Sequence, residues 1–172
     1  MNSKVGHDIK HRQKPNDVIY TPRDLAAYLF EIFGQQSSYQ SGDSILDPFK
    51  GGGAFYDNFP ADNRDWAEIE QGRDFWEWSE PVDWCVSNPP WSMVDKVLEH
   101  TCEISTKGFA YLLNNHGCTP RRLEICEEAG FGLTVMHLSK VFEWYGIAAF
   151  CVFEKDKESI ISYDRKVWRP DE

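Results

Sequence analysis

Short apolar segments recur along this chain of 172 residues, and helix signals separate most of them. The segments predicted as strands are 44–47, 65–69, 82–86, 108–113, 133–138 and 147–153. Helix signals lie between the first strands, whereas only a short loop joins the last two, so the order indicates a mostly parallel sheet with an antiparallel edge strand. The expected fold class is therefore α/β, with helices on both faces of the sheet.

The helix signals each combine a capping residue or a proline with an apolar face behind it. They begin at Thr21-Pro22, at Ala54 after a glycine-rich loop, at Ser92 or Asp95, and at Thr119-Pro120. Gly34 and Gly130 are expected to end the first and the last of these helices, because glycine readily adopts the backbone conformation that closes a helix.

Residues 1–17 form a polar segment with more basic than acidic side chains, and residues 18–172 hold all the predicted elements. The segment 1–17 is predicted as a basic arm, either a disordered tail or an arm that contacts phosphate. The remainder is predicted as one domain, since a chain of this size buries about two thirds of its unfolded surface in a single core. A net charge of −10 argues against coating nucleic acid through the overall field, although a local basic surface could still contact phosphate.

Asn88, Pro89, Pro90 and Trp91 follow the apolar strand that ends near Ser87. Proline fixes its own φ and biases the preceding residue towards extended geometry, so the carbonyl groups here are held in one direction. An amide oxygen can accept a hydrogen bond from an amino group, and an indole ring can stack on a planar group. The tetrapeptide therefore predicts a rigid socket for a planar amine.

Three further groups of residues follow predicted strands, where open parallel sheets bind their ligands. Residues 47–53 include three glycines, whose missing Cβ lets a ligand approach the backbone. Glu68 is placed where an acid often receives ribose hydroxyls, and Glu70 is an alternative to it. Asp74 with Phe75 could recognise an adenine by a hydrogen bond and a ring face. The glycine segment lacks the GxGxxG and GK(S/T) patterns, so nucleotide hydrolysis has no support.

The order DPFKGGGAF, WAEIE, GRDF and SNPPW resembles that of class I methyltransferases, which use S-adenosylmethionine. More narrowly, it resembles the DNA adenine methyltransferases that methylate an exocyclic amino group. The resemblance covers most of the chain, from about Tyr20 to Phe153. It implies a Rossmann-like sheet, S-adenosylmethionine as cofactor, and direct in-line methyl transfer with neither a metal ion nor a covalent enzyme intermediate.

The resemblance also implies a role for each matching residue. The cofactor would be bound by Tyr20, Thr21, Asp47, Pro48, Phe49, Gly51, Gly53, Glu68, Ile69, Asp74, Phe75 and Asn88. The catalytic set would be Asn88, Pro89, Pro90 and Trp91, in which Asn88 and the Pro89 carbonyl accept hydrogen bonds from the target amine. Trp91 would stack on a flipped base. Trp144 or Tyr145 could wall the target pocket, with ordinary packing as the alternative.

A separate recognition region has no place in this sequence, because few residues join Phe75 to Val82 and few follow Phe153. The chain therefore resembles a small, phage-like form, and DNA is its expected partner, with RNA as an alternative. A glutamine-methylating enzyme and a non-catalytic partner that binds nucleic acid also remain open. A recognition partner or a homo-oligomer would then select which adenine is methylated.

Five cysteines without a CxxC pair predict reduced thiols in a cytoplasmic protein. The histidines outside the basic arm have no partners at metal-ligand spacing, so no metal site is predicted. The apolar runs are all shorter than the roughly 20 residues of a membrane span, and the polar start lacks a signal-peptide core. The sequence predicts a soluble protein of a bacterial or phage-infected cytoplasm, without a membrane partner.

Overall fold

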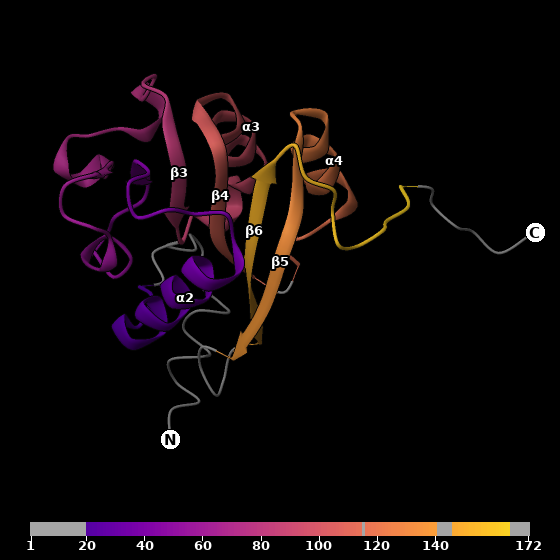
Figure 1. The fold of residues 1–172 in the computed structure, drawn as a ribbon, viewed down its shortest axis with the longest axis horizontal. Coiled ribbons are helices and arrows are strands. Elements are labelled where there is room, and N and C mark those ends of the chain that lie inside the picture. The colour runs from indigo at the N-terminus through magenta and orange to yellow at the C-terminus, as the bar shows by residue number, and fades with distance from the viewer. Residues whose placement is uncertain (1–19, 115, 141–145, 166–172) are drawn as a thin grey trace, which may run out of the picture.

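The computed structural model describes residues 20–114, 116–140 and 146–165, which form one six-stranded sheet in the order β2-β1-β3-β4-β6-β5 (Figure 1). The strands are β1 Ile45–Asp47, β2 Arg64–Trp66, β3 Val82–Ser87, β4 Ser105–Asn114, β5 Phe131–Lys140 and β6 Ile147–Lys155. β1 pairs in parallel with β2 and β3, and β3 in parallel with β4. β6 runs antiparallel to both β4 and β5. The predicted α/β class and the mostly parallel sheet are therefore confirmed.

The edge strand β5 pairs antiparallel with β6, as expected, and the strand that runs against all the others is β6. β6 lies between β4 and β5, and β5 is the edge strand. The short connection returns β6 beside β5, while the other side of β6 pairs with β4 from Gly108↔Glu154 to Asn114↔Ala148. Burial on both sides explains why β6 is almost continuously apolar.

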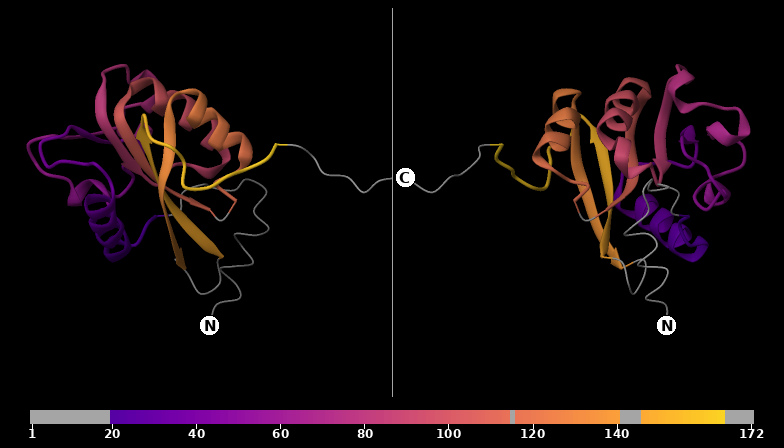
Figure 2. Two further views of the ribbon diagram at one scale, coloured as in Figure 1. Left: turned by 45° about the vertical axis from the view of Figure 1, so that its right-hand side comes forward. Right: turned by 180° about the vertical axis from the view of Figure 1, so that it is seen from behind.

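Helices cover both faces of the sheet, as predicted. Helix α2 (Arg23–Gln36) lies on one face, whereas α3 (Val94–Ile104) and α4 (Pro120–Glu128) lie on the other (Figures 1 and 2). Side chains alternate between the two cores: Trp84 and Val86 pack towards α2, and Cys85 packs towards α3 and α4. The sheet thus separates two apolar layers.

Two helix boundaries differ from the expectation. Helix α2 continues past Gly34 to Gln36, and its last turn is closed by the Ser37 N–H, which donates to the Phe33 carbonyl. At its start, Pro22 rather than Thr21 occupies the capping position, and no side chain caps the helix. The Thr21 hydroxyl therefore does not form the cap that the sequence predicted.

The helix expected from Ala54 is absent, and a single 3-10 turn, Tyr56–Asn58, stands in its place. A further 3-10 turn, Trp91–Met93, precedes α3, and neither Ser92 nor Asp95 caps that helix. Asp95 instead pairs with Arg122 on α4 at 2.6 Å. By contrast, Thr119 caps α4 as predicted, since its hydroxyl accepts the Arg122 N–H.

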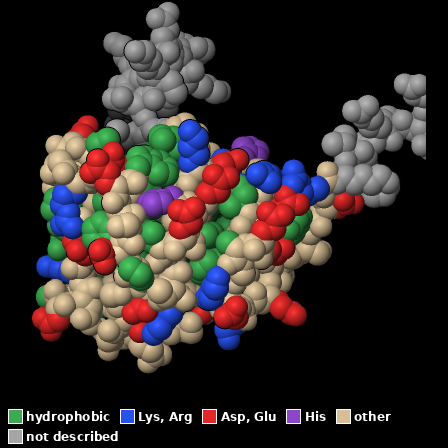
Figure 3. Space-filling view, turned by 90° about the horizontal axis from the view of Figure 1, so that it is seen from above, with side chains coloured by type: hydrophobic (Ala, Val, Ile, Leu, Met, Phe, Trp, Pro, Cys, Tyr) green, Lys and Arg blue, Asp and Glu red, His purple; other side chains and the backbone are tan. Residues whose placement is uncertain are grey.

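One face of the described part of the chain carries mixed charges. Figure 3 looks onto the side nearest the amino ends of the parallel strands, where Lys and Arg side chains lie among those of Asp and Glu. All five cysteines are free thiols, as expected. Within the described ranges, every helix is too short or too polar to cross a lipid bilayer.

Candidate functional site

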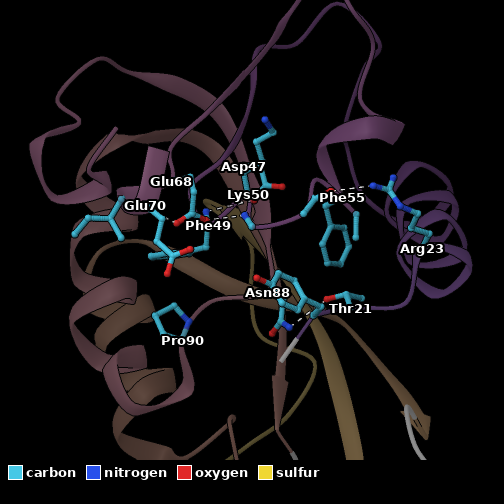
Figure 4. A pocket seen from close by; sticks show the side chains of 15 residues that line it. Thr21, Arg23, Asp47, Phe49, Lys50, Phe55, Glu68, Glu70, Asn88 and Pro90 are labelled. Carbon is cyan, nitrogen blue, oxygen red and sulfur yellow. Dashed lines mark hydrogen bonds between the residues drawn. The ribbon is translucent and has the colours of Figure 1, made fainter. Parts of the chain in front are cut away.

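A cavity of about 430 Å³ lies at the carboxyl ends of β1, β2 and β3, beside the start of α2 (Figure 4). Ligand pockets in proteins typically enclose about 300 to 1,000 Å³. The structure brings to its wall most of the residues that the sequence singled out: Tyr20, Thr21, Asp47, Phe49, Gly51, Glu68, Ile69, Glu70, Asn88 and Pro90. Segments that are far apart in the sequence therefore form one site.

The glycine-rich loop after β1 turns sharply at the floor of this cavity. The Gly53 N–H donates to the Lys50 carbonyl at 2.7 Å, and the Lys50 N–H donates to the Ala67 carbonyl at 3.0 Å. Gly51 has φ +49° and Gly53 has φ +81°, a conformation that side chains with a Cβ rarely adopt. A Cβ added to Gly51 would lie 3.4 Å from the Tyr20 ring. The positive φ angles are what favour glycine here, since a Cβ at Gly51 would make only ordinary van der Waals contact with Tyr20.

Glu68 ties the loop after β2 to the glycine loop. One carboxylate oxygen accepts the Gly51 N–H at 2.7 Å, and the other accepts the Glu70 N–H at 3.3 Å. Glu68 is half-buried, whereas Glu70 is exposed at the rim. A carboxylate has about four acceptor sites, so Glu68 can accept further hydrogen bonds from a ligand. Of the two acids, Glu68 is the one with a fixed position.

Asp47 lies at the end of β1 with only 1% of its surface exposed. Its carboxylate accepts hydrogen bonds from the Ser87 hydroxyl at 2.6 Å and from the Phe49 N–H at 3.3 Å. Burial raises the pKa of Asp47 to about 7, with a smaller contribution from the negative charge of Glu68, although the hydrogen bonds oppose this rise. The Asp47–Ser87 bond joins the glycine loop to the strand that carries Asn88.

The amide nitrogen of Asn88 donates to the Thr21 hydroxyl oxygen at 3.1 Å, and both side chains line the cavity. Pro89 is buried behind them, and Pro90 forms part of the wall. Trp91 is not part of the wall. Its ring packs against the core under α3 and α4, and its indole N–H donates to the Leu112 carbonyl at 3.3 Å. The structure therefore gives Trp91 a packing role, and its stacking on a base stays a prediction.

Several other predicted residues are not brought to the cavity wall. Phe75 is 2% exposed, and its ring packs edge-on against Phe49 and His100, so Phe49 separates it from the cavity. The Asp74 side chain caps a 3-10 turn by accepting the Trp76 N–H at 3.0 Å. In the structure Phe75 has a packing role and Asp74 a capping role, and their contact with a cofactor stays a prediction.

Pro48 and Gly53 are buried within the glycine loop and do not line the cavity. Trp144 and Tyr145, which were expected near the target pocket, lie outside the described residues, as does the basic arm 1–17. Their predicted contacts are untested.

Sequence reasoning missed Arg23, which lines the cavity. Its guanidinium pairs with Asp57 and donates to the Gly52 carbonyl at 2.9 Å, so it clamps the glycine loop to helix α2 (Figure 4). The sequence contained an indication of this role. A cation in the first turn of a helix interacts unfavourably with the helix dipole, which favours a nearby anion as its partner. Ala54 and Phe55 also line the cavity, because the expected helix there does not form.

The comparisons with solved structures identify the fold. A Listeria monocytogenes protein assigned to the class I S-adenosylmethionine-dependent methyltransferases aligns with 92% of this chain and 67% of its own, at TM-score 0.57 and 13% identity. Magnesium protoporphyrin IX methyltransferase from Synechocystis, solved with bound SAM, aligns with 88% of this chain and 80% of its own, at TM-score 0.55 and 12% identity. This chain has the class I methyltransferase fold. M. jannaschii TYW2 in complex with AdoMet also aligns, over 80% of this chain and 78% of its own, at TM-score 0.51 and 12% identity.

Sequence comparisons add nothing to this result: neither the protein-family profiles nor the curated protein sequences give a match. In the class I methyltransferase fold, as in other open sheets, the carboxyl ends of parallel strands are where ligands bind. The cavity occupies that place here.

Proposed function

We propose that this protein transfers a methyl group from S-adenosylmethionine to the exocyclic amino group of adenine in DNA. One observation carries the proposal: Asn88 and Pro90 of the NPPW motif share a single cavity with the glycine loop and Glu68. A methyl transferase needs its donor and its target amine side by side, because positioning supplies much of the rate. The fold and this shared cavity together support the assignment.

The residues around the cavity fit S-adenosylmethionine. Gly51 and Gly52, which line the cavity, would lie against the methionine end, and Glu68 would accept hydrogen bonds from the ribose hydroxyls, with Ile69 as an apolar neighbour of the adenine. Ile69 is 68% exposed at the rim, where a bound ring would cover it. When bound, S-adenosylmethionine supplies an electrophilic methyl group on a sulfonium.

Asn88 acts on the amine of the substrate. The lone pair of an adenine amino nitrogen is delocalised into the ring, so this nitrogen is a weak nucleophile. Hydrogen bonds from the amino group to the Asn88 amide oxygen and to the Pro89 carbonyl would favour a geometry with more lone-pair density on the nitrogen. The socket around Asn88 is rigid, because Ser87 is bonded to the buried Asp47 and two prolines follow. Such an arrangement stabilises the reacting geometry before the substrate enters.

A base inside a duplex cannot enter this cavity, so duplex DNA would require flipping at a free-energy cost of a few kcal/mol, which single strands avoid. The net charge of −10 argues against binding DNA through the overall field, so contacts with phosphate need a local basic surface. We propose that a partner, a second copy of the chain or the basic arm 1–17 supplies these contacts. The proposed site of action is the cytoplasm, where DNA of a bacterium or phage is accessible.

The test is transfer of a labelled methyl group from S-adenosylmethionine to unmodified DNA, followed by acid release and analysis of the bases. We expect N6-methyladenine, and we expect Asn88→Ala to lower its formation by about 100- to 1,000-fold, the range for losing one such polar contact in a reacting centre. Asn63→Ala is the matched control, because this amide lies away from the cavity and donates only weakly, at 3.4 Å, to the Ser41 carbonyl.

Parallel reactions with single-stranded DNA, RNA and protein separate the alternatives. Label in RNA or in glutamine alone would overturn the choice of DNA while keeping the methyl transfer. Calorimetry that detects no S-adenosylmethionine binding would favour a non-catalytic protein that uses this fold to bind nucleic acid.

A further inference from the structure

The cysteines of this chain gather in the apolar core that α3 and α4 cover. Two of them, Cys118 and Cys151, have their sulfur atoms 3.5 Å apart, although they are 33 positions apart in the sequence. Cys118 lies just before α4, and Cys151 lies in β6. The fold therefore places two thiols from separate segments in direct contact.

This pair of thiols has no part in the cavity, whose wall contains no cysteine. It is not a metal site either. Among the residues that the structure describes, no group of three or more His, Cys, Asp or Glu side chains is arranged to hold a metal ion. The contact between the two sulfurs therefore needs another explanation.

The two cysteines differ in access and in freedom to move. Cys151 is 0% exposed, and its strand is paired on both sides, with Tyr111 of β4 and Met136 of β5 as its neighbours. Cys118 is only half-buried, and it lies in the connection between β4 and α4, outside the sheet. A small reagent can therefore reach Cys118 first, while β6 holds Cys151 in place.

The surroundings of Cys118 favour its thiolate. A hydrogen bond from the Cys151 thiol lowers the pKa of Cys118, and the positive charge of Arg122 adds to this effect, although burial opposes it. The position of Arg122 is fixed, because its guanidinium donates to the Gly117 carbonyl at 3.1 Å and pairs with Asp95. Since the thiolate is the nucleophilic form of cysteine, Cys118 is the reactive member of the pair.

Other cysteines of the same core lie in surroundings of the opposite kind. Burial raises the pKa of Cys85 to about 12. A hydrogen bond with Cys102, together with burial, raises the pKa of Cys126. The pKa of Cys151 is also raised, by its hydrogen bond with Cys118 and by burial, so Cys151 stays protonated and acts as the donor. A thiolate is thus favoured at Cys118 and disfavoured at these buried positions.

We propose that Cys118 and Cys151 form a site of reversible oxidation, at which a hydroperoxide converts the two thiols into a disulfide. In the first step the Cys118 thiolate attacks a peroxide oxygen, so that an S–O bond forms and the O–O bond breaks. The departing oxygen takes up a proton and leaves as water or an alcohol. The product at Cys118 is a sulfenic acid.

In the second step the sulfur of Cys151 attacks the sulfur of Cys118. An S–S bond forms, the S–O bond breaks, and the hydroxyl group leaves as water with the proton of the Cys151 thiol. The pair of sulfurs loses two electrons in total, and the peroxide gains them. A dithiol reductant reverses the reaction by thiol–disulfide exchange.

The geometry asks for a small movement. A disulfide bond is about 2.05 Å long, so the two sulfurs must approach one another by roughly 1.5 Å from their present separation. Because β6 is paired on both sides, the connection that carries Cys118 makes most of this movement.

The test treats the reduced, folded protein with hydrogen peroxide, alkylates the remaining thiols after unfolding, and maps the peptides by mass spectrometry. We expect one disulfide, between the peptides of Cys118 and Cys151, with the other cysteines alkylated. Dithiothreitol should restore the full set of five thiols. This mapping requires no variant, so it does not depend on how well a substituted core folds.

Variants identify the role of each sulfur. Cys151→Ala should leave Cys118 as a sulfenic acid, which dimedone traps. Cys118→Ser should slow the loss of thiols to peroxide by about 10-fold, because the favoured thiolate is removed. Cys102→Ser is the matched control, since Cys102 is a half-buried cysteine of the same core, and it should keep the parent's rate and disulfide.

Three results would overturn the proposal. They are a disulfide that joins another pair, such as Cys102 with Cys126, oxidation of all thiols at equal rates without a disulfide, and a disulfide that forms only in urea. The test uses neither S-adenosylmethionine nor DNA. Its outcome is therefore independent of the proposed function.

Discussion

The buried carboxyl of Asp47 should make the stability of this protein depend strongly on pH. Burial raises its pKa from 3.8 to about 7 in the folded state. A folded pKa above the unfolded one means that the folded protein binds the proton more tightly, so the contribution is complete below about pH 4. It is lost as the pH rises from about 4 through about 7, and it stays lost above that range. Each pKa unit corresponds to about 1.4 kcal/mol, which gives a loss of about 4 kcal/mol.

Asp47→Asn removes this dependence, because an amide does not ionise. The amide oxygen can still accept the hydrogen bonds from Ser87 and from the Phe49 N–H, which meet the same oxygen of Asp47. Asp47 also accepts a hydrogen bond from the Tyr56 backbone, and the cost of weakening that bond is the same at every pH. Urea unfolding at pH 4, 5, 6, 7 and 8 gives the free energy of unfolding of both proteins. We expect the variant to gain on the parent by up to about 4 kcal/mol between pH 4 and 8, a large share of the 5 to 15 kcal/mol of a typical domain.

In the difference between the two free energies of unfolding, the pH dependence of the groups that both proteins share cancels. Asp62→Asn, at an exposed position, makes the same change of charge and should follow the parent curve closely. A constant difference between Asp47→Asn and the parent across the pH range would refute the reasoning. It would mean that Asp47 is ionised in the folded protein throughout, stabilised by its hydrogen bonds more than burial opposes it.

Three other substitutions or deletions test the roles of individual parts. Trp91→Ala should lower the free energy of unfolding by about 2 kcal/mol, because the half-buried ring packs on the core and donates to the Leu112 carbonyl; an unchanged melting temperature with lost use of DNA would instead favour base stacking. Glu68→Gln should weaken S-adenosylmethionine binding by about 10-fold in calorimetry, whereas Glu70→Gln should change it by less than twofold, and the reverse order would assign the ribose to Glu70. Deleting residues 1–15 should reduce the dependence of DNA affinity on salt, and an equal slope would show that the arm does not contact phosphate.

The positions of the strands along the chain were predictable because they depend on local signals. Apolar runs bounded by glycine, proline and polar residues located all six strands, and Thr119 with Pro120 marked the start of α4. The same signals failed at Ala54, where the chain after the glycine loop forms only a 3-10 turn. Phe55 and Phe59 there are buried against the α2 core, so tertiary packing rather than helix propensity sets this segment.

The site was predictable only in part, because some of its contacts depend on tertiary packing rather than on local signals. Residues at strand ends, such as Asp47, Glu68 and Asn88, were found because their place follows from the sheet. The packing of the Phe75 ring between Phe49 and His100 could not be inferred, because both contacts come from other segments of the chain. The use of the Thr21 hydroxyl could not be inferred, because its partner lies in another segment and local capping rules predict a different bond.

β2 lies at one edge of the sheet, where a strand with unpaired backbone groups could associate with another chain. This edge strand is only three residues long, and two cations lie over its one aromatic ring. Lys50 lies 4.2 Å and Arg73 lies 4.4 Å from the centre of the Trp66 ring. Each such contact contributes about 0.5 to 1 kcal/mol at an exposed site. Lys50 belongs to the glycine loop that lines the cavity, so its contact with Trp66 joins the wall of the cavity to the edge strand.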